Sequence, residues 1–277
     1  MRYVIGIDVG GSTTKTVGFQ NGTLISPIMV KASDPKASLF GGFGKFLEDN
    51  RLKLDEIERV MVTGVGSSIL AGSIYGIPAY KVDEFRAIGK GGLFLSGLHH
   101  AIVVSMGTGT AIVAAGEDYV RHIGGTGVGG GTLLGLSNRM LNIRDFNALI
   151  KAAEGGSLHH VDLFVNDLTS EIIHTLPDQV TASNFGRISD LATPADIAMG
   201  IINLVLQTIG VTSAFASHIE KTKDIVLTGT LTGIPYAREI FNGLESLHGV
   251  TYTLPEHAEF ATSVGAALCK PEETAEK

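Results

Sequence analysis

The sequence has a single cysteine, Cys269, and no tryptophan among its 277 residues. One cysteine excludes a disulfide within the chain, and it excludes a zinc or iron–sulfur site built from several cysteines of one chain. We expect Cys269 to be a small buried residue near the C-terminus.

Long apolar runs and clusters of basic residues are also missing. The most apolar stretch, near 197–211, is interrupted by Gly200, Asn203 and Gln207, so no uninterrupted 18-residue segment predicts a membrane span. The formal net charge is −7, and the sequence contains no run of Lys and Arg that could neutralise the phosphates of a nucleic-acid duplex. The first residues form a strand-like pattern and lack the features of a signal peptide. We therefore expect a cytoplasmic protein with no nucleic-acid or membrane partner.

Glycine, in contrast, is abundant, with 36 residues gathered beside Thr and Ser. These glycines follow no fixed repeat, so they indicate neither collagen nor a flexible linker. Such clusters are typical of places where the backbone approaches a ligand closely. A hydrophobic fraction of 44% and a charged fraction of 18% indicate a compact globular chain.

One pattern of predicted elements occurs twice. A buried strand, a glycine turn and two further strands are predicted over 2–30, with a hairpin turn at Asn21-Gly22, and again over 101–123. Helices are predicted over residues 36–50, 84–96, 132–140, 145–153, 157–172, 193–221 and 258–268. The repeat predicts an α/β protein with two lobes of one duplicated βββ-α plan. We place an N-terminal lobe at 1–98 and a C-terminal lobe at 99–277, with the last helix crossing back.

The clearest local motif is GIDVGGSTTK, from Gly6 to Lys15. A buried strand carries Asp8 to its carboxyl end, where it can hold Mg²⁺ directly or through water. The glycine turn that follows directs N–H groups toward a phosphate, and neighbouring hydroxyl and ammonium groups add donors. The motif is neither a Walker A loop nor G-x-G-x-x-G. The alternative is a plain hairpin in which Asp8 only caps the turn.

Three more glycine turns follow, at 106–110, 124–132 and 228–230. The turn at 124–132 precedes a predicted helix, whose N-terminal N–H groups would face a phosphate. Four turns of this kind predict a nucleotide held between the two lobes. The predicted nucleotide-binding residues are Gly10, Gly11, Ser12, Thr13, Lys15, Thr108, Gly109, Gly129, Gly130, Gly131, Thr132, Gly229 and Thr230.

The ordered strings GIDVGG, TGVGSS, MGTGT and TGTL resemble the phosphate and adenosine motifs of one superfamily, which joins acetate kinase, the sugar kinases, the heat-shock ATPases and actin. Three further strings, EF at 84–85, RHIGG at 121–125 and TASNFG at 181–186, resemble bacterial type II pantothenate kinases. The resemblance spans about residues 3–268. It implies the ribonuclease H-like, actin-like ATPase fold, with ATP and Mg²⁺ in the cleft between the lobes. It further implies pantothenate or pantetheine as the acceptor, and a homodimer.

The resemblance assigns Glu84 as the base or orienting group for the acceptor hydroxyl. Without it, the favoured explanation of Glu84 is a first-turn acid that complements the helix dipole, and Asp83 is the competing carboxylate. The family places Arg where this chain has His122, with Arg121 one residue earlier. Since neighbours in a strand face opposite ways, either residue is the candidate contact for the acceptor. The predicted substrate-binding residues are Glu84, Thr108, Thr110, Arg121, His122 and Asn184.

Two other functions share this pattern. The activating ATPases of acyl-CoA dehydratases open with a similar motif, although they hold an iron–sulfur cluster with cysteines from each subunit, and this chain has one cysteine. An N-acetylhexosamine kinase of the same fold would use an Asp as its base, for which Asp83 is available.

Overall fold

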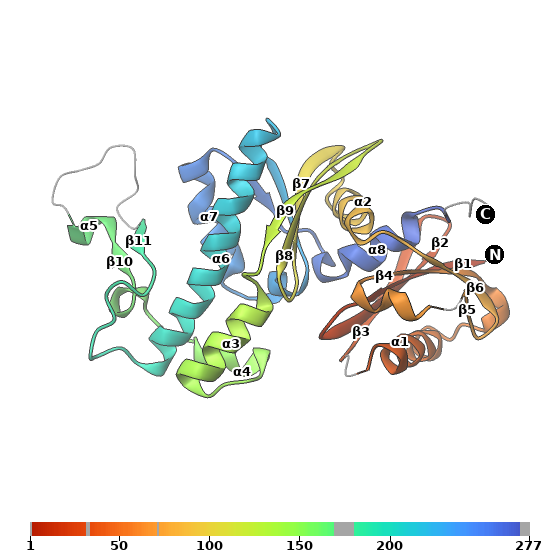
Figure 1. The fold of residues 1–277 in the computed structure, drawn as a ribbon, viewed down its shortest axis with the longest axis horizontal. Helices are drawn as coiled ribbons and strands as arrows, with labels where there is room; N and C mark the ends of the chain where they lie inside the picture. Colours follow the sequence, from red (N-terminus) through yellow and green to blue (C-terminus); the bar gives the residue numbers. More distant parts are fainter. Residues whose placement is uncertain (1, 32–33, 71, 169–179, 272–277) are drawn as a thin grey trace.

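The computed structural model describes residues 2–31, 34–70, 72–168 and 180–271 (Figure 1). Its first sheet has six strands in the order β3-β2-β1-β4-β6-β5. They are β1 (Tyr3–Val9), β2 (Thr13–Gln20), β3 (Thr23–Lys31), β4 (Ile57–Thr63), β5 (Ser73–Ile74) and β6 (Ile77–Lys81). β1 pairs antiparallel with β2 and parallel with β4, so Asp8 lies between Lys15 and Thr63. The predicted hairpin turn is confirmed, with positive φ at both Asn21 and Gly22.

The second sheet has five strands in the order β13-β12-β7-β8-β9. They are β7 (His100–Met106), β8 (Thr110–Gly116), β9 (Val120–Thr126), β12 (Asp224–Thr228) and β13 (Thr251–Thr253). Here β7 pairs antiparallel with β8 and parallel with β12, as β1 does with β2 and β4. The series β3-β2-β1-β4-β6 and β9-β8-β7-β12-β13 therefore agree in order and direction, which confirms the duplicated plan. β10 (Leu163–Phe164) and β11 (Thr181–Ser183) form a separate two-stranded sheet.

Helices surround both sheets (Figure 1). The α-helices are α1 (Pro35–Asp49), α2 (Glu84–Ser96), α3 (Gly130–Leu141), α4 (Phe146–Ala152), α5 (Val165–Leu168), α6 (Pro194–Ile219), α7 (Ala237–His248) and α8 (Ala261–Leu268). Short 3₁₀ helices in the described ranges are η1 (Leu54–Glu56), η2 (Val65–Ile69), η3 (Leu158–His160), η4 (Thr230–Gly233) and η5 (Ala258–Phe260). The α7 and β13 segments have no counterpart among the predicted elements.

The prediction of one helix over 157–172 is wrong for the described part of that segment. Residues 157–168 instead form η3, β10 and α5, while 169–172 lie outside the described residues. The physical reason is Asp162, which is buried and accepts hydrogen bonds from Phe185 N (2.9 Å) and Asn203 Nδ2 (2.8 Å). A continuous helix would not bring this carboxylate to both partners, and an unpaired buried carboxylate is costly.

Two helices cross between the sheets (Figure 1). α2 follows the first sheet but packs on β7, β8 and β9, whereas α8 follows the second sheet and packs on β1, β2 and β4. The two helices touch at glycines: a Cβ on Gly91 would lie 1.8 Å from the carbonyl oxygen of Ala261, and one on Gly265 would lie 1.8 Å from that of Ala87. Only glycine permits so close a crossing. α2 and α8 thus tie the two halves together.

By length and composition alone α6 is apolar enough to cross a membrane, with an 18-residue window of mean hydropathy 1.6. However, 61% of that window is buried inside the protein. Its buried residues, among them Ile201, Ile202 and Val205, join the core beneath the second sheet with Ile102 and Leu227. This packing is that of a core helix.

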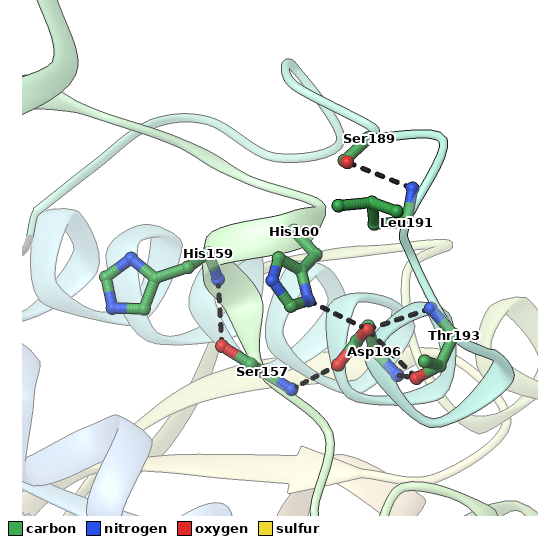
Figure 2. Close-up of polar contacts among 7 residues, drawn as sticks. All are labelled: Ser157, His159, His160, Ser189, Leu191, Thr193 and Asp196. Carbon is green, nitrogen blue, oxygen red and sulfur yellow. Dashed lines mark hydrogen bonds and ion pairs between the residues drawn. The ribbon is translucent and has the colours of Figure 1, made fainter.

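The N-terminus of α6 is held by a buried carboxylate (Figure 2). Asp196 accepts hydrogen bonds from the backbone N–H of Ser157 (2.6 Å) and of Thr193 (2.8 Å), and His160 Nδ1 lies 3.1 Å away. Burial alone would raise the pKa of Asp196, but these hydrogen bonds outweigh it and hold the pKa below its ordinary value. The cluster fixes the loop before η3 to the start of α6.

Candidate active site

Three parallel strands of the first sheet end side by side. Asp8 in β1 lies opposite Thr63 in β4, and Val82, just after β6, donates its N–H to the carbonyl of Val62 (2.8 Å). Glu84 begins α2 two residues later. Ligands of open α/β sheets bind at the carboxyl ends of parallel strands. Asp8 and Glu84 therefore share one edge.

Asp8 and Lys15 are cross-strand partners with unusual electrostatics. Burial raises the pKa of Asp8, and the positive charge of Lys15 partly offsets the effect. Burial likewise lowers the pKa of Lys15, with Asp8 and Glu259 opposing. Among the described residues, no hydrogen-bond donor reaches the Asp8 carboxylate, so its desolvated charge is available to a cation.

Glu84 is the second carboxylate of this edge. Loss of hydration raises its pKa, and the negative charges of Asp8 and Asp83 raise it further. Asp83 has a different task, because its Oδ1 accepts the N–H of Arg86 (2.8 Å) and caps α2. The structure thus distinguishes a capping Asp83 from a Glu84 whose charge interacts with that of Asp8.

The glycine turn after β7 packs against the start of α3. Gly130 donates its N–H to the carbonyl of Gly107 (2.8 Å), and Gly131 donates to that of Thr108 (2.8 Å). A Cβ on Gly129 would lie 2.7 Å from the carbonyl oxygen of Thr108, so glycine is required there. These bonds differ from the expectation that the N–H groups of Gly130 and Gly131 face a phosphate, because neighbouring carbonyls already accept them.

The remaining hydroxyl and glycine residues of the turns hold the loops in shape. Thr110 donates to the carbonyl of Val128 (2.8 Å), and Thr132 donates to that of Gly127 (2.9 Å). Gly10 donates its N–H to the carbonyl of Thr13 (3.0 Å), and Gly109 accepts the N–H of Gly107 (2.9 Å). The loops are therefore fixed by their own hydrogen bonds.

Gly64 and Gly229 follow equivalent strands, β4 and β12, and have the same backbone conformation. Their φ angles are 87° and 91°, in a region that favours glycine. A Cβ on Gly64 would lie 2.6 Å from Asp8 Oδ1, and one on Gly229 would lie 2.6 Å from the carbonyl oxygen of Met106. Each glycine lets a 3₁₀ helix begin directly against a neighbouring strand end.

A cavity of about 1170 Å³ lies where the halves meet. It is lined by these predicted nucleotide-binding residues: Ser12, Thr13, Thr108, Gly130, Gly131 and Thr230. Lys15 reaches the same place, donating from Nζ to Thr230 Oγ1 (3.2 Å), and a Cβ on Gly11 would lie 3.8 Å from Thr108 Oγ1. The separate glycine bends thus surround one cavity of nucleotide size.

Other lining residues escaped the sequence analysis. They are apolar residues and charged residues of both signs, and include Leu134, Arg144, Phe146, Ile234, Pro235, Arg238, Leu254, Glu256 and Glu259. They come from helix starts and loops that carry no motif. Some had a nearby signal: Leu134 follows the glycine turn at 124–132, and Ile234, Pro235 and Arg238 follow the Thr-Gly-Thr turn at 228–230.

Arg121 and His122 in β9 face opposite ways. Arg121 Nη2 lies 2.7 Å from both carboxylate oxygens of Glu220, which caps the C-terminus of α6. The His122 ring stacks on Phe85, the neighbour of Glu84, with ring centroids 4.0 Å apart. His122 therefore lies on the side of α2 and Glu84, and Arg121 on the side of α6.

Asn184 lies in a separate polar network. Its Nδ2 donates to Asp162 Oδ2 (3.3 Å) and to Gln207 Oε1 (3.2 Å). Gln207 in turn donates to Thr181 Oγ1 (3.2 Å). Asn184 is not among the residues that line the large cavity, and its contacts tie the 181–186 segment to α6.

A duplicated sheet with glycine turns from both halves around one cavity, and a partly buried carboxylate at the end of β1, defines a protein of the actin-like ATPase fold. Solved structures agree. The activator of 2-hydroxyisocaproyl-CoA dehydratase from Clostridium difficile, with bound ADPNP, has a TM-score of 0.68 at 16% identity, covering 96% of this chain and 93% of that one. The ROK hexokinase from Thermus thermophilus has a TM-score of 0.56 at 14% identity, covering 96% and 97%.

The family follows from the sequence comparisons. The Fumble family matches residues 96–240, slightly more than half of the chain. A type II pantothenate kinase of Bacillus cereus is 30% identical over 242 residues, which are 81% of this chain and 81% of that protein. This chain belongs to the type II pantothenate kinase family.

Proposed function

We propose that this protein transfers the γ-phosphoryl group of ATP to the primary hydroxyl of pantothenate, the first step of coenzyme A synthesis. The observation that carries the proposal is the position of Asp8 and Glu84, two carboxylates with raised pKa values at one strand edge. Lys15, the cross-strand partner of Asp8, links this edge to the cavity rimmed by glycine turns, because it bonds Thr230 of the cavity wall. Perturbed carboxylates beside a cavity are typical of catalytic sites. The family relationship supplies the substrate class.

Magnesium fits this arrangement. The desolvated Asp8 carboxylate is a hard oxygen ligand without a hydrogen-bond donor among the described residues, and the described residues hold no cluster of three or more His, Cys, Asp or Glu side chains. Mg²⁺ is usually held by one or two carboxylates together with phosphates and water. When bound, it would neutralise charge on the phosphates.

The chain's own residues supply positioning. Lys15 and Thr230, joined by a hydrogen bond, place an ammonium and a hydroxyl at the phosphate end of the cavity. Gly10, Gly11, Ser12, Thr13, Thr108, Gly109, Gly129, Gly130, Gly131, Thr132 and Gly229 form the surrounding turns. Glu84 orients the acceptor hydroxyl and accepts its proton as the O–P bond forms. Its raised pKa makes Glu84 a better proton acceptor than an ordinary surface carboxylate.

The acceptor side is formed by Glu84, Thr108 and Thr110, with His122 rather than Arg121 nearest to α2. We propose that the His122 ring, held against Phe85, is the group that contacts the acceptor carboxylate. Asn184 contributes indirectly, because its hydrogen bond to Gln207 ties the 181–186 segment to α6. Pantetheine, which lacks the carboxylate, is then a competing acceptor.

An ADP-release assay with pantothenate, pantetheine, N-acetylglucosamine or no acceptor tests the proposal. Turnover that requires pantothenate or pantetheine supports it. Turnover only with N-acetylglucosamine would replace it with a sugar kinase. Acceptor-independent turnover would favour an ATPase that drives a partner, the function named for the structurally similar dehydratase activator.

We also propose two lobes, at 1–98 and 99–277, and a cytoplasmic homodimer. The C-terminal half of α6 supports the dimer, because Phe215 is 56% exposed and Ile219 is 71% exposed. Exposed large apolar side chains on one helix are typical of interfaces. Light scattering of the purified protein measures the mass directly, and a monomer at micromolar concentration would contradict this proposal.

A further inference from the structure

The strand registers of the two sheets define equivalent positions. Asp8 pairs with Thr63 across β1 and β4, and Ser105 pairs with Thr228 across β7 and β12. Gly64 and Gly229 come next, with φ angles of 87° and 91°. Each is followed by a 3₁₀ helix, so Val65 at the start of η2 is the counterpart of Thr230 at the start of η4.

The two counterparts differ in chemistry. Thr230 lines the large cavity and accepts a hydrogen bond from Lys15 of the other half. The counterpart of Lys15 is Ala111, because Asp8 pairs with Lys15 and Ser105 pairs with Ala111. The hydroxyl of Thr230 therefore corresponds to the apolar side chain of Val65, and the ammonium of Lys15 corresponds to the methyl group of Ala111.

Val65 is exposed beside the catalytic edge. It is 72% exposed and directly follows Gly64, where a Cβ would lie only 2.6 Å from Asp8 Oδ1. Phe85, 36% exposed, directly follows Glu84. Glu84 thus has an exposed apolar neighbour in sequence, and an exposed apolar residue also follows Gly64, the glycine that lies against Asp8. Covering such a side chain with an apolar ligand group is favourable, because it removes apolar surface from water.

We propose that Val65 is a specificity-determining residue that packs against the apolar carbon skeleton next to the acceptor's primary hydroxyl. This inference rests on the proposed function. In pantothenate the hydroxyl-bearing CH₂ is attached to a quaternary carbon with two methyl groups. An acceptor hydroxyl placed at Glu84 and the Asp8 edge brings these methyl groups toward Val65.

The test compares two acceptors with two proteins. The acceptors are pantothenate and an analogue in which both methyl groups are replaced by hydrogen, and the proteins are wild type and Val65→Ser. Burial of one methyl group changes affinity about fourfold, so the two methyl groups together should make wild type prefer pantothenate by about 15-fold in kcat/KM. In Val65→Ser this preference should fall to about twofold. The KM for ATP and the kcat with the analogue should stay unchanged.

Leu54 provides a matched control. It is 46% exposed in η1, at the amino end of the same strand β4 that Val65 follows. Leu54→Ser removes a similar exposed apolar side chain from the opposite end of the sheet and should keep the full methyl preference. Val65→Leu should also keep it, which separates loss of the contact from loss of the fold.

An unchanged methyl preference in Val65→Ser, with wild type still phosphorylating pantothenate, overturns the role of Val65 and leaves the proposed function intact. A preference lost equally in Leu54→Ser would also overturn it. If wild type does not phosphorylate pantothenate at all, the proposed function fails and the role of Val65 fails with it.

Discussion

The first and second sheets have the same strand order, but only the first carries charge at its central strand end. Asp8, Lys15 and Thr63 occupy adjacent positions there, and the second sheet has Ser105, Ala111 and Thr228. Desolvation shifts the pKa values of Asp8 and Lys15 toward their neutral forms. The backbone thus supplies two similar edges, and the side chains place charged groups at only one of these two strand ends.

The difference has a stability consequence. Burying Asp8 and Lys15 is unfavourable, and an ordinary apolar pair would stabilise the edge more. Ser105 and Ala111 impose no such penalty on the second sheet. Desolvated charged groups that lower the stability of the fold are typical of functional sites. The comparison therefore predicts that the first edge carries the chemistry and that the second serves as scaffold.

The largest effect is expected for Asp8→Asn. Removing the carboxylate should lower pantothenate phosphorylation about 10³-fold, because Asp8 is the group that would hold the Mg²⁺ proposed to neutralise charge on the phosphates. Ser105→Ala, at the equivalent position, should stay within about threefold of wild type. Coupled ADP release measures both. Similar losses in both variants would contradict the asymmetry between the sheets.

Glu84→Gln should lose phosphoryl transfer by about 10²-fold while ATP binding is retained. The equivalent helix α8 begins with Ala261, and the carboxylates of the second half nearest to this start are Glu256 and Glu259, which line the large cavity. Asp83→Asn is the control, since an amide oxygen still accepts the N–H of Arg86 and caps α2. Near-normal turnover of Glu84→Gln would remove Glu84 from the mechanism.

The pH profile gives a second readout for Glu84. A base works ionised, so kcat/KM should fall as pH falls through the pKa of Glu84, which is raised above its ordinary 4.5. Asp83→Asn removes one of the charges that raise this pKa. The acid limb should therefore move to lower pH in Asp83→Asn. A limb that stays in place would assign it to another group.

Gly64→Ala and Gly229→Ala test the equivalence of the two glycines. Each should destabilise folding by about 1–3 kcal/mol, because φ angles of 87° and 91° strain any other residue. The added methyl at Gly64 also meets Asp8 Oδ1, so Gly64→Ala should lose more activity at equal stability. Urea unfolding with parallel kinetics distinguishes the two effects. Equal activity losses would show that the Asp8 contact is unimportant.

Lys15→Met should raise the KM for ATP about tenfold, with a smaller change in the KM for pantothenate. The variant loses the ammonium that bonds Thr230 across the two halves. Nucleotide titration by calorimetry measures the loss without turnover. Unchanged nucleotide affinity would mean that Lys15 serves only to pair with Asp8.

The smallest effect is expected in β9. His122→Ala should raise the KM for pantothenate about fivefold, whereas Arg121→Ala should leave it within about twofold. The reason is that the two side chains point to opposite sides of β9: His122 stacks on Phe85, and Arg121 pairs with Glu220. A larger effect from Arg121→Ala would reverse this assignment.

Much of the fold was predictable because its signals are local. The hairpin at Asn21-Gly22, the helix α2 from Glu84 to Ser96 and the repeated strand–turn–strand pattern depend on residues close in sequence. The 157–172 prediction failed where Asp162 takes partners 23 and 41 residues away. α7 was missed although its sequence is amphipathic, and most cavity residues outside the glycine turns carried no motif.

By itself, the sequence determined where the strands end, where the backbone bends at glycine, and that Asp8 stands at one such end. Backbone sterics and alternating burial act over a few residues, so their effects can be predicted from the sequence without knowledge of the fold. Tertiary structure alone decided that His122 faces α2, that neighbouring carbonyls accept the N–H groups of Gly130 and Gly131, and that Lys15 meets Thr230 from 215 residues away. Contacts of that range depend on how the two halves pack, because α2 and α8 cross at glycines and set the distance between the sheets.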